Sequence, residues 1–256
     1  MATYLDVLIY SFLGGLLSLV GGLLLIRKQS SARKLALYGT PFAAGALLAA
    51  VFMDLLPEGV TADDTVSVFI GCLVGFLGFF VFQRILGSVH HHHDENEKTD
   101  HLESSRLSII IGNTAHNALD GVAIGAAFLV NIPTGIVTTI AIAAHEIPHE
   151  IGDFALLLSR KMSRKAVVLI NVFAAVLSTL VALLVFGLGG SDKLPVNFLL
   201  GLSAGFLLYI SASDIIPTIN TKIAKSPIKD WQLLMLLLGV VVVSLVIRFA
   251  EGFIVA

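Results

Sequence analysis

Two short segments of this chain combine histidine and acidic residues at helical spacing. The sequence HNALDG begins at His116, and the sequence HEIPHE begins at His145. Asp120 follows His116 by four residues and His149 follows His145 by four, so on a helix each pair shares one face. Imidazole nitrogens and carboxylate oxygens are suitable ligands for Zn²⁺, Fe²⁺ and Mn²⁺. The two segments therefore predict a divalent metal site built by two helices.

Both segments lie within long apolar stretches, which strengthens the metal hypothesis. A charge at the centre of a bilayer costs at least about 2.5 kcal/mol, so several such residues need a compensating partner. A structural polar network is the alternative, but it would leave the carboxylates without a cation. The candidate metal ligands are His116, Asn117, Asp120, His145, Glu146, His149 and Glu150.

The composition is that of a membrane protein. The chain is 56% hydrophobic and 13% charged, whereas soluble domains average about 25% charged residues. The net charge of −2 gives no indication of a nucleic-acid partner. Cys72 is the single cysteine, which excludes an internal disulfide and a thiolate-cluster metal site.

Eight apolar stretches of about 20 residues are long enough to cross the hydrocarbon core of a bilayer. They predict an all-α integral membrane protein with eight transmembrane helices and the metal site between the fourth and fifth. We expect residues 1–256 to form a single polytopic domain, with a flexible loop at 87–106. The predicted spans are Tyr4–Ile26, Tyr38–Glu58, Val66–Leu86, Leu107–Val130, Thr134–Ser159, Ala166–Leu188, Pro195–Pro217 and Trp231–Ala250.

Basic residues are concentrated in alternate connections between these spans. Arg27 and Lys28 follow the first span, and Arg160 and Lys161 follow the fifth, whereas the other connections carry mainly acids such as Asp63. By the positive-inside rule the basic connections are cytoplasmic. We therefore expect a multi-pass protein of the cell membrane with both termini on the non-cytoplasmic side.

An internal repeat relates the second span to the seventh. The segments at 45–57 and 205–217 each place an acid three residues before a proline, and the two acids, Asp54 and Asp214, are 160 positions apart. The two spans run in opposite directions, and inverted repeats of this kind are typical of transporters. Asp54 and Asp214 are thus candidates for the entry and exit of a pathway, although helix-end acids are often only solvated.

The loop between the third and fourth spans contains four consecutive histidines. His90, His91, His92 and His93 precede several acidic residues, and such tracts bind metal loosely. The hypothesis is metal capture or sensing by this loop. The alternative is a solvated loop without a metal function.

At these residues the chain resembles the ZIP (Zrt/Irt-like) family of divalent metal transporters. HNALDG is similar to that family's His-Asn-x-x-Asp/Glu-Gly signature, and HEIPHEIGD is similar to the His-Glu-x-Pro-His-Glu-x-Gly-Asp motif of its subfamily with histidine-rich loops. The resemblance implies movement of Zn²⁺, and in some members Fe²⁺, Mn²⁺ or Cd²⁺, into the cytosol. It also implies a homodimer in which helices 1, 4, 5 and 6 slide against helices 2, 3, 7 and 8.

The resemblance further implies a binuclear metal centre. His116, Asp120, His145 and His149 would form the primary position, and Asn117 and Glu146 the second, with His149 as a bridge. Some family members add a glutamate from the sixth span, but residues 171–178 contain no acid here. The second position is therefore expected to be weaker or regulatory.

Two other functions fit parts of the pattern. His145-Glu146-x-x-His149 satisfies the motif of an intramembrane zinc metalloprotease, in which the glutamate activates a metal-bound water. Pro148 inside the motif and the extra donors His116 and Asn117 argue against that enzyme, which keeps a coordination position open for water. A membrane metal sensor that binds without conducting is the third candidate.

Overall fold

The computed structural model describes residues 2–60, 64–89, 100–189, 195–217, 219 and 231–255. The described residues form helices and connecting turns, with no β-strand among them. Two of the helical segments, η1 and η2, are π-helices. The elements are α1 Tyr4–Arg27, α2 Gln29–Ala50, η1 Val51–Leu55, α3 Leu56–Gly59, α4 Thr65–Val89, α5 Asp100–Val130, α6 Ile132–Ser159, α7 Arg164–Gly189, α8 Val196–Tyr209, η2 Ile210–Ile215 and α10 Trp231–Val255.

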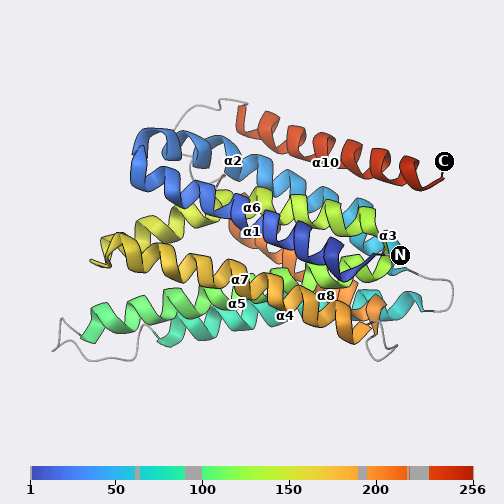
Figure 1. Ribbon diagram of the computed structural model, residues 1–256, viewed down its shortest axis with the longest axis horizontal. Helices are drawn as coiled ribbons and strands as arrows, with labels where there is room; N and C mark the ends of the chain where they lie inside the picture. Colours follow the sequence, from blue (N-terminus) through green and yellow to red (C-terminus); the bar gives the residue numbers. More distant parts are fainter. Residues whose placement is uncertain are drawn as a thin grey trace.

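The helices lie roughly side by side in one elongated bundle. The beginning of α1 and the end of α10 lie at the same end of that bundle (Figure 1). Six of the described helices are long and apolar enough to cross a membrane. Their outward faces expose large apolar side chains such as Phe69, Leu73, Leu169 and Phe173. A surface this apolar indicates lipid contact, so the architecture is that of a multi-pass membrane protein.

The two long helices outside that set of six are α5 and α6, which carry the predicted metal ligands. Several helices are also longer than the predicted spans. α2 begins at Gln29 rather than Tyr38, and α5 begins at Asp100 rather than Leu107. The apolar stretch reports the thickness of the hydrocarbon, whereas helical hydrogen bonding continues beyond it. Helix α4, which ends at Val89, and α5 therefore cover both ends of the predicted loop 87–106.

A tight turn makes α5 and α6 antiparallel neighbours. Helix α5 ends at Val130 and α6 begins at Ile132, with Asn131 between them. The backbone N–H of Thr134 donates to Asn131 Oδ1 at 2.8 Å, which satisfies one of the free N–H groups at the start of α6. This connection sets the two predicted metal-binding segments on adjoining helices.

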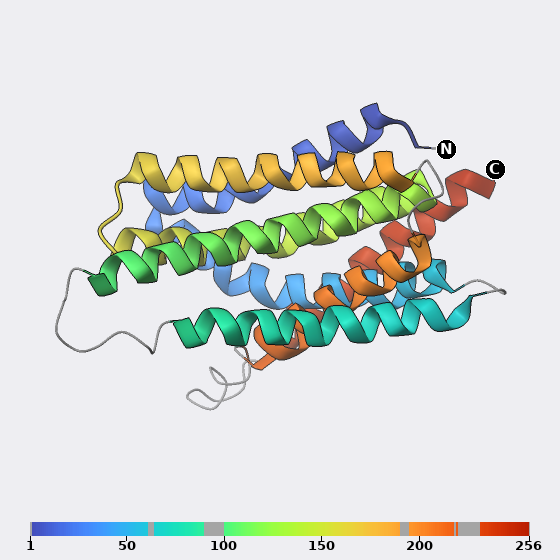
Figure 2. The ribbon, with the colours of Figure 1, turned by 90° about the horizontal axis from the view of Figure 1, so that it is seen from below.

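The closest backbone contacts, those at glycines, fall within two groups of helices, which also pack on each other where α2 meets α6. In the first, α1, α5, α6 and α7 pack tightly, and a Cβ on Gly121 of α5 would overlap the carbonyl oxygen of Ser178 on α7. In the second, α2 packs tightly on α10 and α4 packs tightly on α8, where a Cβ on Gly205 would overlap the carbonyl oxygen of Cys72. Small residues allow this backbone approach in membrane helices. In Figure 2, α1, α5 and α7 of the first group lie above α4 of the second.

Candidate metal centre

The structure brings four ionisable side chains of the two predicted segments together. His116 and Asp120 come from α5, and His145 and Glu146 come from α6. One ligand atom from each lies within 4.8 Å of the others. All four side chains are buried, with exposed fractions of 5% or less. We call these four residues the α5–α6 cluster.

The distances within the α5–α6 cluster suit a shared metal ion. His116 Nε2 lies 3.1 Å from His145 Nε2 and 3.1 Å from Glu146 Oε1. His145 Nε2 lies 3.9 Å from Asp120 Oδ2. Two ligands at about 2.1 Å from a tetrahedral Zn²⁺ are about 3.4 Å apart, and the observed separations lie on both sides of that value. Small side-chain movements would therefore complete the coordination.

The two acids of the cluster need a positive partner. Both carboxylate oxygens of Asp120 are buried and accept no hydrogen bond, and both of Glu146 are buried, with the ring nitrogen of His116 3.1 Å from Oε1. A buried carboxylate without partners is strongly unfavourable, which is why buried acids in proteins pair with cations or bind metals. The fully buried Glu150, one turn further along α6, also has two oxygens without a hydrogen-bond partner. The donor set is thus rich in nitrogen and oxygen ligands and in uncompensated negative charge.

His149 lies beside the cluster rather than among its four ligand atoms. Its ring stacks on that of His116 with centroids 4.7 Å apart and planes 6° apart. Its Nδ1 is 3.8 Å from Glu146 Oε1 and 3.7 Å from Asp153 Oδ2. The side chain is 34% exposed, far more than the cluster residues. The fourth ligand atom of the cluster therefore comes from Glu146 and not from His149. Metal binding by His149 or Glu150 stays a prediction.

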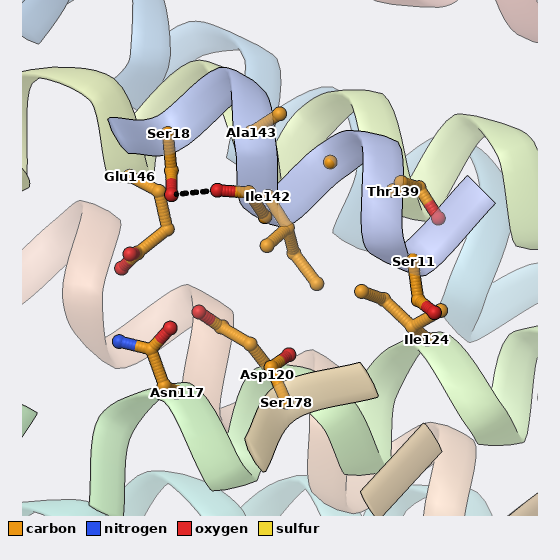
Figure 3. A pocket seen from close by; sticks show the side chains of 12 residues that line it. Ser11, Ser18, Asn117, Asp120, Ile124, Thr139, Ile142, Ala143, Glu146 and Ser178 are labelled. Atoms are coloured by element: carbon orange, nitrogen blue, oxygen red, sulfur yellow. Dashed lines mark hydrogen bonds between the residues drawn. The ribbon is translucent and has the colours of Figure 1, made fainter. Parts of the chain in front are cut away.

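A small cavity adjoins the cluster on the side of α1. Its volume is about 10 Å³ for water-sized species, room for about one water molecule. Asn117 and Asp120 of α5, Glu146 of α6 and Ser18 of α1 contribute to its lining. Figure 3 shows Asn117 and Asp120 facing Glu146 across this space. The predicted ligand Asn117 is thus next to the cluster and directed into the same polar cavity.

The structure places some of the remaining predicted residues and leaves others undescribed. Asp54 is buried in η1, where Thr134 Oγ1 donates to its Oδ1 at 3.2 Å. Asp214 belongs to η2, but its side chain lies outside the described residues. The histidines His90–His93 also lie outside them. A pathway role for the two acids and metal capture by the histidine loop stay predictions.

Sequence reasoning missed two buried asparagines close to the cluster. Asn113 lies one turn before Asn117 on α5, and Asn171 lies on α7. Asn113 Nδ2 donates to Asn171 Oδ1 at 2.6 Å. Each asparagine is an amide side chain inside an apolar span, where a polar group needs a partner, and this feature of the sequence could have predicted that each is paired.

Comparison with known proteins identifies a family. A family model described as ZIP zinc transporter matches residues 5–108 and 88–247. Zinc transporter YKE4 of Saccharomyces cerevisiae is 29% identical over 239 residues, covering 80% of this chain and 68% of that protein. Zinc transporter foi of Drosophila melanogaster is 41% identical over 113 residues, covering 44% of this chain and 16% of foi. The human metal cation symporter ZIP14 is 38% identical over 112 residues, covering 44% of this chain and 22% of ZIP14.

Several of these relatives are much longer than the region they share with this chain. The chain covers 16% of foi and 15% of the zebrafish (Danio rerio) zinc transporter ZIP10. The matched part includes the cluster, because the family match spans α5 and α6.

Proposed function

Because the chain belongs to the ZIP zinc transporter family, we propose that it carries divalent metal ions, with Zn²⁺ foremost, across a membrane into the cytosol. The α5–α6 cluster is the transport site. The observation that carries this proposal is the convergence of two imidazoles and two buried carboxylates, from two helices, within 4.8 Å. Fe²⁺, Mn²⁺ and Cd²⁺ are further candidate substrates, because the same donor types bind them.

We propose that the chain crosses the membrane eight times, with α5 and α6 in the interior of the bundle. Polar side chains on α5 and α6 would be unfavourable in contact with lipid. Other helices shield them, since α6 packs on α1 and α2 and α5 packs on α7 and α8. An even number of crossings agrees with the two chain ends lying at one end of the bundle. The basic connections support an orientation with both termini outside. A homodimer in the cell membrane stays a prediction.

We propose that metal is exposed alternately to the two sides by sliding of the two helix groups. Tight backbone contacts support two rigid units, since the glycine contacts of α5 with α7 and of α4 with α8 each lie within one group. The internal repeat is typical of transporters with a midplane site, and the π-helices η1, beginning at Val51, and η2, beginning at Ile210, fall at corresponding positions of its two copies. Both copies belong to the second group, which would therefore carry the repeat as one unit.

The protease alternative is not favoured by the geometry. A protease of the H-E-x-x-H type uses both motif histidines as ligands and keeps the glutamate free as a base. Here Glu146 stands among the four ligand atoms, whereas His149 lies outside that group. The relatives compared above are also named as transporters or symporters. No contact of the described residues favours a sensor that binds metal without conducting it.

Uptake of radiolabelled Zn²⁺ into liposomes containing the purified chain tests the proposal. We expect His145→Ala to abolish uptake, because it removes a central ligand of the cluster. Ser203→Ala is the control, since Ser203 is equally buried on α8 but contributes no ligand atom. Zn²⁺ binding without uptake in the parent chain would favour the sensor, and peptide cleavage without uptake would favour the protease. Competition by unlabelled Fe²⁺, Mn²⁺ and Cd²⁺ ranks the substrates.

A further inference from the structure

Helix α7 has no acidic or histidine residue, yet it is connected to the metal centre through buried amides. Asn171 Nδ2 donates to the backbone carbonyl of Val167 at 2.8 Å. Asn171 Oδ1 accepts from Asn113 Nδ2 at 2.6 Å, and Asn113 Oδ1 accepts from Asn117 Nδ2 at 2.8 Å. The three amides are at most 4% exposed. They form one continuous chain of hydrogen bonds, which we call the amide chain.

The amide chain has a fixed direction because a backbone carbonyl stands at each end. At one end the Val167 carbonyl can only accept, so Asn171 must present its nitrogen there. At the other end Asn117 Nδ2 also lies 3.2 Å from the backbone oxygen of Asn113, which again can only accept. Flipping the amides would bring oxygen against oxygen at both ends. The two backbone groups thus determine all three amide orientations together.

The direction of the chain decides which atom Asn117 offers to the cavity. Its nitrogen is committed to Asn113, so its oxygen is the polar atom left for the cavity that Asn117 and the two cluster acids line. A carboxamide oxygen is a metal ligand, whereas an amide nitrogen with two hydrogens repels a cation. We propose that Asn113 and Asn171 are positioning residues that hold the Asn117 oxygen toward the transported cation. This inference rests on the proposed transport site.

In this proposal α7 contributes to metal binding by orienting a ligand on α5, although α7 supplies no metal ligand itself. Partners that orient a metal ligand typically contribute 10- to 100-fold to metal affinity. The amide chain also joins α7 to α5 by a hydrogen bond between side chains in the membrane interior. Helix α7 therefore moves with α5 and keeps Asn117 oriented throughout a sliding movement.

Calorimetric Zn²⁺ titration of the full chain in lipid nanodiscs tests the positioning role. Asn171→Leu is made in the parent and in an Asn117→Ala background. We expect about 10-fold weaker Zn²⁺ binding from Asn171→Leu in the parent and no further loss in the Asn117→Ala background, because the effect passes through Asn117. An equal loss in both backgrounds, or no loss in the parent, overturns the proposal. A parent chain that binds no Zn²⁺ overturns the proposed transport site itself, so the two failures are distinguishable.

A double variant separates positioning from stability. Removing both partners of the Asn113–Asn171 hydrogen bond avoids the unsatisfied group that removing one of them leaves, and Asn117 Nδ2 keeps the backbone oxygen of Asn113 as an acceptor. We therefore expect the Asn113→Leu/Asn171→Leu chain to unfold within a few degrees of the parent on heating, while its Zn²⁺ affinity stays about 10-fold weaker. An affinity that returns to the parent value together with stability would show that the amides act only through packing.

Discussion

Asp120→Asn should have opposite effects on the metal-free and the metal-bound protein. The Asp120 carboxylate is 1% exposed, and neither oxygen accepts a hydrogen bond. Its nearest basic atoms, Nε2 of His116 and of His145, lie 3.7 and 3.9 Å from Oδ2, too far for hydrogen bonds. Without a cation, this carboxyl group is therefore in an unfavourable site, whether it stays charged or takes up a proton. The substitution keeps the shape of the side chain and removes the charge.

The size of each effect follows from the same geometry. An unsatisfied buried polar group costs about 1–3 kcal/mol, and a charged one more, so the metal-free variant should be more stable by about 2 kcal/mol. Two unit charges 4 Å apart at an effective dielectric constant of about 20 interact by about 4 kcal/mol. Loss of the carboxylate should then weaken Zn²⁺ binding by at least about 100-fold, equivalent to about 2.8 kcal/mol.

Thermal unfolding with a chelator measures the stability of the metal-free protein. Unfolding with saturating Zn²⁺ measures the stabilisation by metal, and calorimetry measures the Zn²⁺ affinity. We expect the variant to unfold at a higher temperature than the parent in chelator and to gain less from Zn²⁺. Asp6→Asn makes the same substitution outside the cluster. Because Asp6 accepts hydrogen bonds from Thr3 in the capping box at the start of α1, we expect this control to lower stability slightly and to leave Zn²⁺ binding unchanged. A metal-free Asp120→Asn chain less stable than the parent would refute the idea that Asp120 is in an unfavourable site without a cation.

Three further variants test the two helix groups, the first two their packing and the third a hydrogen bond between them. Gly121→Ala places a methyl group against the carbonyl oxygen of Ser178 and should lower stability by about 1–3 kcal/mol. Gly39→Ala has nothing within 4 Å and should leave the unfolding temperature unchanged or higher, so equal effects of the two would contradict the tight α5–α7 contact. Thr134→Val removes a hydrogen bond to Asp54 that joins the two groups, and should change the Zn²⁺ uptake rate while the calorimetric affinity is unchanged. An altered affinity with an unaltered rate would argue against a role for that bond in sliding.

The sequence predicted the helices and the metal-binding segments because both depend on local patterns. Apolar length reports the hydrocarbon thickness, so the start of α1 at Tyr4 and of α10 at Trp231 agrees with the predicted spans. Helical periodicity likewise placed His116 and Asp120 on one face. Both inferences need only the neighbours of each residue along the chain.

The arrangement across helices was less accessible to sequence reasoning. His149 and Glu146 lie three residues apart on α6, and the rotation of that helix decides which of them faces α5. That rotation depends on packing, for example where Gly21 of α1 meets the backbone of Ile147. The pairing of Asn113 with Asn171 likewise joins residues 58 positions apart, which no local pattern indicates.

The placement of the cluster bears directly on how the metal would stay bound during the proposed sliding movement. All four cluster residues belong to α5 and α6, within one helix group. The other group meets the site through aromatic rings, because Phe79 of α4 and Phe206 of α8 lie edge-on to His116 with centroids 6.0 and 5.4 Å away. A sliding movement would change these apolar contacts, which unlike coordination bonds do not require a particular orientation. The set of metal ligands would stay intact. The metal would then cross the membrane without exchanging ligands between the groups, and the aromatic rings would form the apolar wall past which the site moves.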